Sequence, residues 1–225
     1  MTGAITKNSF ITDGEELRRL RFAPGESPFR IKGNGYRGHL KYVQENLPGG
    51  VEAMKDAFED PRLKEFFNQT FLASAFYDVI PLAHAGLICA EISGMSFYDF
   101  VYERTRHQAE EDVRGVYKWL LTLLSPRLVS SRLTKFMAQY FDFMSFELEH
   151  SDATVVRGRL TGAPFELRGW ITAVFEAYYC HVFKLGGVKE YAIEFTERRE
   201  AVGADGEPTI EVGIELSFGP DGESA

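Results

Sequence analysis

The spacing of apolar and polar positions divides this chain into a helical first half and a second half of alternating segments. Apolar residues recur every three or four positions through 39–47 and 51–58, and the run from 78 stops at Gly94. A longer stripe at the same spacing extends from Val101 to Leu120, with small residues midway that would let another element approach closely. This pattern predicts helices, the last of them reaching Leu124.

Local start signals agree with these helices. Asp60 before Pro61, and Ser125 before Pro126, are typical of a helix cap followed by proline in the first turn. Ser96 and Asp99 have the spacing of a capping box, and Asp78 is a further candidate cap. A short strand is predicted at 29–31, ahead of the first helix.

After residue 144 the period changes from helical to alternating. Residues 145–150 and 153–160 read as a hairpin, and an aromatic helix over 165–185 follows it and ends at Gly186 and Gly187. Two more strands are predicted at 190–197 and 209–218. The fold class is therefore α+β, with an N-terminal helical half followed by a β-β-α-β-β antiparallel sheet unit.

We expect one α+β domain over 29–218, preceded by an irregular segment at 1–28 and followed by a flexible acidic tail at 219–225. Almost all of the net charge of −8 falls after residue 188, so the body of the chain is near neutral. An acidic balance argues against nonspecific nucleic-acid binding, and we expect no nucleic-acid partner. The acidic residues near the C-terminus are interpreted as charges that protect a sheet edge from aggregation. The alternative is that this acidic edge strand recruits a basic partner.

The apolar stretch Val79–Ala90 is interrupted by Pro81 and His84 and is too short to cross a bilayer, so no membrane partner is expected. The N-terminus lacks the features of a secretory signal. Two cysteines are too few for a disulfide framework. Together these features predict a cytoplasmic protein.

Gly33, Gly35 and Gly38 match the spacing G-x-G-x-x-G after a predicted strand and at the start of a helix. A dinucleotide site would also need a second parallel strand with an acidic residue about 20 positions later. That window is predicted to be helical instead. We therefore interpret the glycines as a strand-to-helix turn and keep a nucleotide site as the alternative.

Glu103, His107 and Glu111 share one helical face and could hold a metal ion. They are surrounded by Arg104, Asp112 and other charged residues, which is the ordinary composition of a solvated helix face. Cys89 and Cys180 lie outside any motif that activates a thiol. We expect no metal, no cofactor and no enzymatic activity.

The richest chemistry lies in the aromatic helix, where rings with polar tips could orient a ligand inside an apolar pocket. The alternative is a core helix whose polar tips bond to the backbone. The candidate ligand-binding residues, here and in the helical half, are Tyr77, His84, Trp119, Trp170, Tyr178 and His181.

Several local features resemble a known superfamily. They are the strand-glycine-helix start over 31–40, the run from Phe76 to Leu82, Ser125-Pro126, Tyr140-Phe141, and the helix ended by Gly186-Gly187. The layout is similar to haem-nitric-oxide-binding domains, to the vinyl-reductase-like ligand-binding domains of bacterial regulators and to the small subunits of TRAPP tethering complexes. More narrowly, the chain resembles a myxobacterial paralogous family of unknown function.

Haem-binding members of that superfamily use a proximal histidine and a Tyr-x-Ser-x-Arg motif that holds the propionates. Tyr102 and Arg106 match this spacing, but Arg104 stands in place of the serine. The resemblance favours a non-enzymatic sensor or ligand-binding module for an apolar small molecule in bacterial signalling. The alternative is a protein-interaction scaffold that acts as a homodimer.

Overall fold

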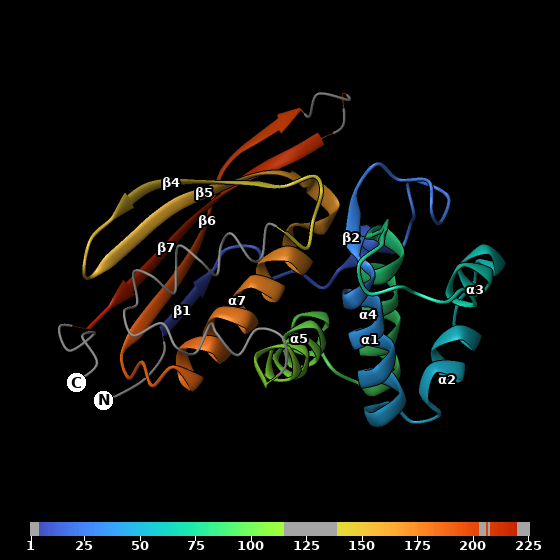
Figure 1. Ribbon diagram of the computed structural model, residues 1–225. Helices are drawn as coiled ribbons and strands as arrows, with labels where there is room; N and C mark the ends of the chain where they lie inside the picture. Colours follow the sequence, from blue (N-terminus) through green and yellow to red (C-terminus); the bar gives the residue numbers. More distant parts are fainter. Residues whose placement is uncertain (1–4, 115–138, 203–205, 207, 220–225) are drawn as a thin grey trace.

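Helices occupy the first half of the chain and strands most of the second, as the hydrophobic pattern predicts. The computed structural model describes residues 5–114, 139–202, 206 and 208–219. Figure 1 shows a twisted sheet with one long helix across its face and a group of helices beyond that helix. The fold is α+β, which confirms the predicted fold class.

The main sheet has the strand order β1-β6-β7-β5-β4. All pairs among the last four strands are antiparallel, which confirms the predicted sheet unit. The first strand pairs parallel with β6, and it lies inside the segment that was predicted to be irregular. That prediction was wrong because four residues are too few to show a period. The strands are β1 (Ile5–Asn8), β4 (Ser145–Ser151), β5 (Val155–Pro164), β6 (Tyr191–Val202) and β7 (Pro208–Phe218).

Helix α7 (Arg168–Leu185) follows the short 3-10 turn η3 (Phe165–Leu167) and packs against one face of the sheet. Alternate residues of β7 from Ile210 to Phe218 are buried on that face. Phe183 of the helix meets Phe218 edge to face, with ring centroids 5.4 Å apart. The aromatic residues of this helix therefore fill the core between helix and sheet.

The remaining helices are built as their start signals predict. The backbone N–H of Arg62 donates to Asp60 Oδ1 (2.9 Å), and that of Asp99 donates to Ser96 Oγ (3.0 Å). One helix is apolar from Ile80 to Ala90 except at His84, and every residue in this range is buried. The helices are α1 (Gly33–Asn46), α2 (Gly50–Asp56), α3 (Pro61–Phe67), α4 (Ile80–Ser93) and α5 (Phe97–Arg114), and a 3-10 turn η1 (Glu15–Leu17) precedes them.

The glycine motif forms a strand-to-helix turn, as interpreted from the sequence. Strand β2 (Arg30–Lys32), paired with β3 (Phe76–Asp78), runs directly into α1 at Gly33. A Cβ atom on Gly33 would lie 2.2 Å from the carbonyl oxygen of Leu72. A Cβ atom on Gly38 would lie 1.2 Å from Gln108 Oε1 on α5. These glycines are needed because other parts of the chain approach the helix closely.

Part of the prediction falls outside the described residues. This holds for the helix beyond residue 114 up to Leu124, for most of the helix predicted from Ser125, and for the tail from residue 220. In the described part of the chain, no single helix is long and apolar enough to cross a membrane. Helices α4 and α5 pass that test only as a pair, which is bent by 109°.

Candidate functional site

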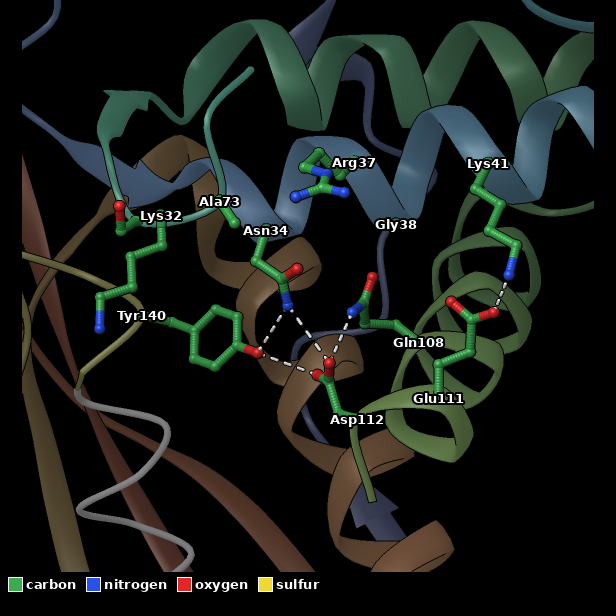
Figure 2. A pocket seen from close by; sticks show the side chains of 11 residues that line it. Lys32, Asn34, Arg37, Gly38, Lys41, Ala73, Gln108, Glu111, Asp112 and Tyr140 are labelled. Carbon is green, nitrogen blue, oxygen red and sulfur yellow. Dashed lines mark hydrogen bonds and ion pairs between the residues drawn. The ribbon is translucent and has the colours of Figure 1, made fainter. Parts of the chain in front are cut away.

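A cavity of about 630 Å³ lies between α1, α5 and the residues just before β4. Figure 2 shows α1 along one side, α5 along the other and Tyr140 at one end. Ala73 and Ser74, from the loop before β3, also contribute to the wall. The lining residues are Lys32, Asn34, Arg37, Gly38, Lys41, Ala73, Ser74, Gln108, Glu111, Asp112 and Tyr140.

The buried carboxylate of Asp112 organises this cavity. Its Oδ1 accepts hydrogen bonds from Gln108 Nε2 (3.0 Å) and Asn34 Nδ2 (3.2 Å). Its Oδ2 accepts from the hydroxyls of Tyr140 (2.9 Å) and Tyr178 (3.0 Å). One carboxylate therefore holds four donors that come from α1, α5, α7 and the segment before β4.

The position of Gln108 follows from helical spacing and from Gly38. Gln108 and Asp112 are four residues apart, so their side chains meet on one face of α5. The amide of Gln108 fits against α1 only because residue 38 has no side chain. Since its nitrogen donates to Asp112, its oxygen is directed away from Asp112, and this buried Oε1 atom has no hydrogen-bond partner among the described residues.

Burial sets the charge states around Asp112. It raises the pKa of the Asp112 carboxyl, against the effect of the hydrogen bonds that Asp112 accepts. The buried Arg104 guanidinium lies one turn before Gln108 on α5, and desolvation lowers its pKa to about 10. Desolvation, with the nearby Arg104 charge, lowers the pKa of the buried His39 to about 3. At neutral pH Arg104 is therefore a buried cation, and His39 is neutral.

The wall of the cavity also carries basic side chains. Lys41 forms an ion pair with Glu111, as Figure 2 shows. Lys32 lies over the ring of Phe76, with its nitrogen 5.9 Å from the ring centroid. In the ranges that the structure describes, neither Lys32 nor Arg37 has an ion-pair partner.

The raised pKa of Asp112 predicts a pH dependence of stability. Folding favours the protonated carboxyl, so its stabilising contribution is complete below the unfolded pKa of about 3.9 and is lost as the pH rises through the raised folded value. Asp112→Asn does not titrate. Relative to this variant, the free energy of unfolding of the wild type should therefore fall as the pH rises from below about 3.9 towards neutrality. Urea unfolding at a series of pH values measures this difference, and a difference that is constant or increases with pH would contradict the expectation.

Of the predicted site residues that the structure describes, only Tyr178 contacts this carboxylate. Trp170 is in the core, edge to face with Phe141 at 6.2 Å. His84 donates from Nδ1 to the carbonyl of Leu17 (2.7 Å). These two residues have structural partners away from the cavity.

The other three candidates lie elsewhere or cannot be placed. The Tyr77 hydroxyl accepts from the backbone N–H of Leu72 (2.9 Å), and its ring packs against Phe71. His181 is buried on α7 and does not line the cavity. Trp119 lies outside the described residues.

Sequence reasoning missed Asn34, Gln108, Asp112 and Tyr140. Arg104 and Asp112 were interpreted as part of a solvated helix face, and that interpretation was wrong because both are buried. The available signal was the spacing of Arg104, Gln108 and Asp112, which places three polar residues on one stripe of α5. The neighbouring stripe of Glu103, His107 and Glu111 is the solvated one.

That solvated stripe does not form the metal site considered from the sequence. Arg106 pairs with Glu103, and Glu111 pairs with Lys41. His107 Nε2 lies 3.6 Å from Glu45 of α1. Among the described residues, no group of three or more His, Cys, Asp or Glu side chains is arranged to hold a metal ion.

Comparison with solved structures identifies the fold as that of H-NOX (haem-nitric-oxide-binding) domains. A mutant Fe(II) unliganded H-NOX protein from K. algicida is 12% identical, has a TM-score of 0.57, and the match covers 85% of this chain and 98% of that chain. A mutant H-NOX from T. Tengcongensis is 13% identical, with a TM-score of 0.53 and coverage of 84% and 97%. At such identities the likeness concerns the fold alone.

A third solved neighbour is described under the heading of haem redox potential and protein-induced porphyrin distortion. It is 10% identical, has a TM-score of 0.52, and the match covers 84% of this chain and 100% of that chain. No family model matches this chain, and no curated protein does. Nothing in these comparisons supports the narrower resemblance to a myxobacterial family.

The histidines of this chain do not fit a haem at the cavity. All five lie within the described residues, and none lines the cavity. His39, His84 and His181 are buried within the packed interior. His107 lies beside Glu45, and His150 contacts Asp152 at 2.8 Å.

The propionate motif considered from the sequence is not formed either. Tyr102 packs against Tyr98 on α5, with ring centroids 5.9 Å apart. Arg106 pairs with Glu103 on an exposed face of the same helix. The residues present therefore do not fit haem at this cavity, and its chemistry must come from the polar side chains that line it.

Proposed function

We propose that this chain is a non-enzymatic ligand-binding module of the sensor type, which holds a small molecule in the cavity between α1 and α5. The observation that carries the proposal is the Asp112 carboxylate, which accepts hydrogen bonds from four side chains, of which Asn34, Gln108 and Tyr140 line the cavity. The H-NOX-like fold supports it, because a solved neighbour of that fold is described as an unliganded Fe(II) H-NOX protein, which implies a protein that takes a ligand.

The size and order of the cavity suit a small ligand. Its volume of about 630 Å³ falls in the range of roughly 300–1,000 Å³ that is usual for ligand pockets. The donors are held by a buried carboxylate, so their side-chain entropy is lost on folding rather than on binding. A site ordered in this way requires little rearrangement when a ligand enters.

The lining favours a polar ligand over the apolar one expected from the sequence. The rings that motivated an apolar ligand, such as Trp170 and Phe183, are packed in the core and do not line the cavity. Asn34, Arg37, Gln108 and Asp112 line it instead. The ligand class therefore changes, while the proposal of a ligand-binding module stands.

A non-enzymatic role is supported by the state of the candidate reactive groups. Burial raises the pKa of the Cys89 thiol to about 12, so its thiolate is not formed near neutral pH. The neutral His39 lies outside the residues that line the cavity. The Asp112 carboxylate already accepts four hydrogen bonds. None of these groups is prepared for nucleophilic or general-base chemistry on a ligand in the cavity.

Filling the cavity should abolish binding. We expect at least one compound of a broad small-molecule collection, including neutral and apolar members, to raise the melting temperature of the wild type. At a concentration 100 times Kd the stabilisation is about 2.7 kcal/mol, which corresponds to a shift on the order of 5 °C or more for a chain of this size. Ala73→Trp places an indole in the wall and should remove the shift.

The matched control is Gln69→Trp, which adds the same side chain at an exposed position outside the cavity lining. It should leave the shift unchanged. A collection that gives no shift, or a shift that persists in Ala73→Trp, would contradict the proposed function.

The homodimeric scaffold remains the alternative proposal, and cytoplasmic location remains a prediction. Light scattering at micromolar concentration distinguishes a dimer from the 25.5 kDa monomer. Exposed apolar side chains such as Leu72 and Leu148 lie on different parts of the described surface, at the α3–β3 loop and on edge strand β4. The cavity is therefore the stronger basis for a function.

A further inference from the structure

We infer that the cavity binds a small organic anion, a carboxylate or a phosphate that also carries an N–H or O–H donor. This inference rests on the proposed function and adds the chemical class of the ligand. It is carried by the charges that remain after the internal pairs of the cavity are assigned, and by one unsatisfied acceptor in its wall.

The negative charges of the cavity are already compensated. Glu111 pairs with Lys41 at one end. Asp112 accepts hydrogen bonds from four donors, and its charge raises the pKa of the buried Arg104 against the effect of desolvation. Neither carboxylate is therefore available as the main partner of a cationic ligand.

The remaining charges are positive. Arg37 is exposed on α1 between Lys32 and Lys41 in Figure 2, and Lys32 is partly buried against Phe76. Two cations without an ion-pair partner in the described part of the chain thus face one cavity, although the chain as a whole carries a net charge of −8. A basic cavity in an acidic chain concentrates anions selectively at this place.

The acceptor is Gln108 Oε1. Gln108 is 94% buried and lines the cavity, and in the part of the chain that the structure describes its oxygen accepts no hydrogen bond. A buried amide oxygen without a partner is unfavourable. Gln108 Oε1 lies against Gly38, so a ligand donor supplies the missing hydrogen bond when the Gln108 amide turns towards the cavity. An anion without a donor, such as chloride or sulfate, would leave this atom unpaired, which is why the inference specifies an anion that also carries a donor.

Isothermal titration at low ionic strength tests the charge requirement with two pairs of probes. Adenosine monophosphate is compared with adenosine, and 4-hydroxyphenylacetate with its neutral amide. We expect at least one anion to bind, and its neutral counterpart to bind at least about tenfold more weakly, because a hydrogen bond to a charged group is worth about 1.5–3 kcal/mol. The member that binds distinguishes a phosphate ligand from a carboxylate.

Variants locate the site. Arg37→Gln and Lys32→Gln should each weaken anion binding about tenfold. Glu111→Gln releases Lys41 and should strengthen it, an effect that a purely structural role of Glu111 would not produce. Arg19→Gln, at an exposed position away from the cavity, is the control and should leave the affinity unchanged.

The inference is overturned if neither anion binds, if a neutral counterpart binds as tightly as its anion, or if Arg37→Gln and Lys32→Gln leave the affinity unchanged. The proposed function fails separately. The proposed function survives each of these results if a neutral or apolar compound raises the melting temperature of the wild type but not that of Ala73→Trp. It fails if no compound raises the melting temperature of the wild type.

Discussion

Replacing Asp112 with alanine is expected to lower the free energy of unfolding by about 3 kcal/mol or more. The substitution removes the acceptor that Asn34, Gln108, Tyr140 and Tyr178 share. It also leaves the buried Arg104 guanidinium without the negative charge that stabilises it most. Buried charges and donors that lose their partner are among the most destabilising defects in a folded chain.

Urea denaturation measures this effect, with Glu111→Ala as the control. Glu111 is the next residue on α5, and its ion pair with Lys41 is partly exposed to solvent, so its loss should change stability by less than about 1 kcal/mol. Equal effects of the two substitutions would show that Asp112 does not organise the packing of α1, α5 and α7.

Replacing Gly33 with alanine should be similarly severe, by about 3 kcal/mol. A Cβ atom there would lie 2.2 Å from the Leu72 carbonyl oxygen and 2.7 Å from Cε2 of Tyr77. The Leu72 carbonyl oxygen belongs to the backbone and cannot rotate away as a side chain can. The β2–α1 junction at Gly33 and the α3–β3 loop must therefore move apart. The cavity wall at Ala73 would move with this loop, because the Asn34 N–H donates to the Ala73 carbonyl (3.1 Å).

Gly86→Ala is the matched control for Gly33→Ala. Its Cβ atom would meet its nearest neighbours at 3.8 Å inside α4, which is ordinary contact. Alanine is the better helix former by roughly 0.8–1 kcal/mol, so this variant should be neutral or more stable in the same urea experiment. A Gly33→Ala variant as stable as wild type would contradict the tight strand-to-helix turn.

The elements were predictable because their signals are local. Asp60, Ser96 and Gly94 begin or end helices as their residue types indicate, and Gly94 adopts a φ of 67°. The strands β4 to β7 follow their alternation. Strand β1 could not be predicted because it is defined by its parallel pairing with β6, a contact across more than 180 residues.

The site was less predictable than the fold. Helix α5 carries two polar stripes at four-residue spacing, Glu103-His107-Glu111 and Arg104-Gln108-Asp112. Composition does not distinguish them, and only the packing of α1 and α7 decides that the second is buried. The aromatic residues favoured in the sequence are enriched in cores for the same reason that they suit pockets, so the sequence leaves both environments open for Trp170, which the structure places in the core.

The most direct test of the proposed site is nuclear magnetic resonance of the side-chain amides during titration with adenosine monophosphate and 4-hydroxyphenylacetate. The amide groups of Asn34 and Gln108 line the cavity and give signals that single substitutions can assign. We predict that a bound anion shifts these two signals, together with backbone signals of α1 near Arg37. Binding that shifts signals elsewhere and leaves both side-chain amides unchanged would contradict a ligand site between α1 and α5.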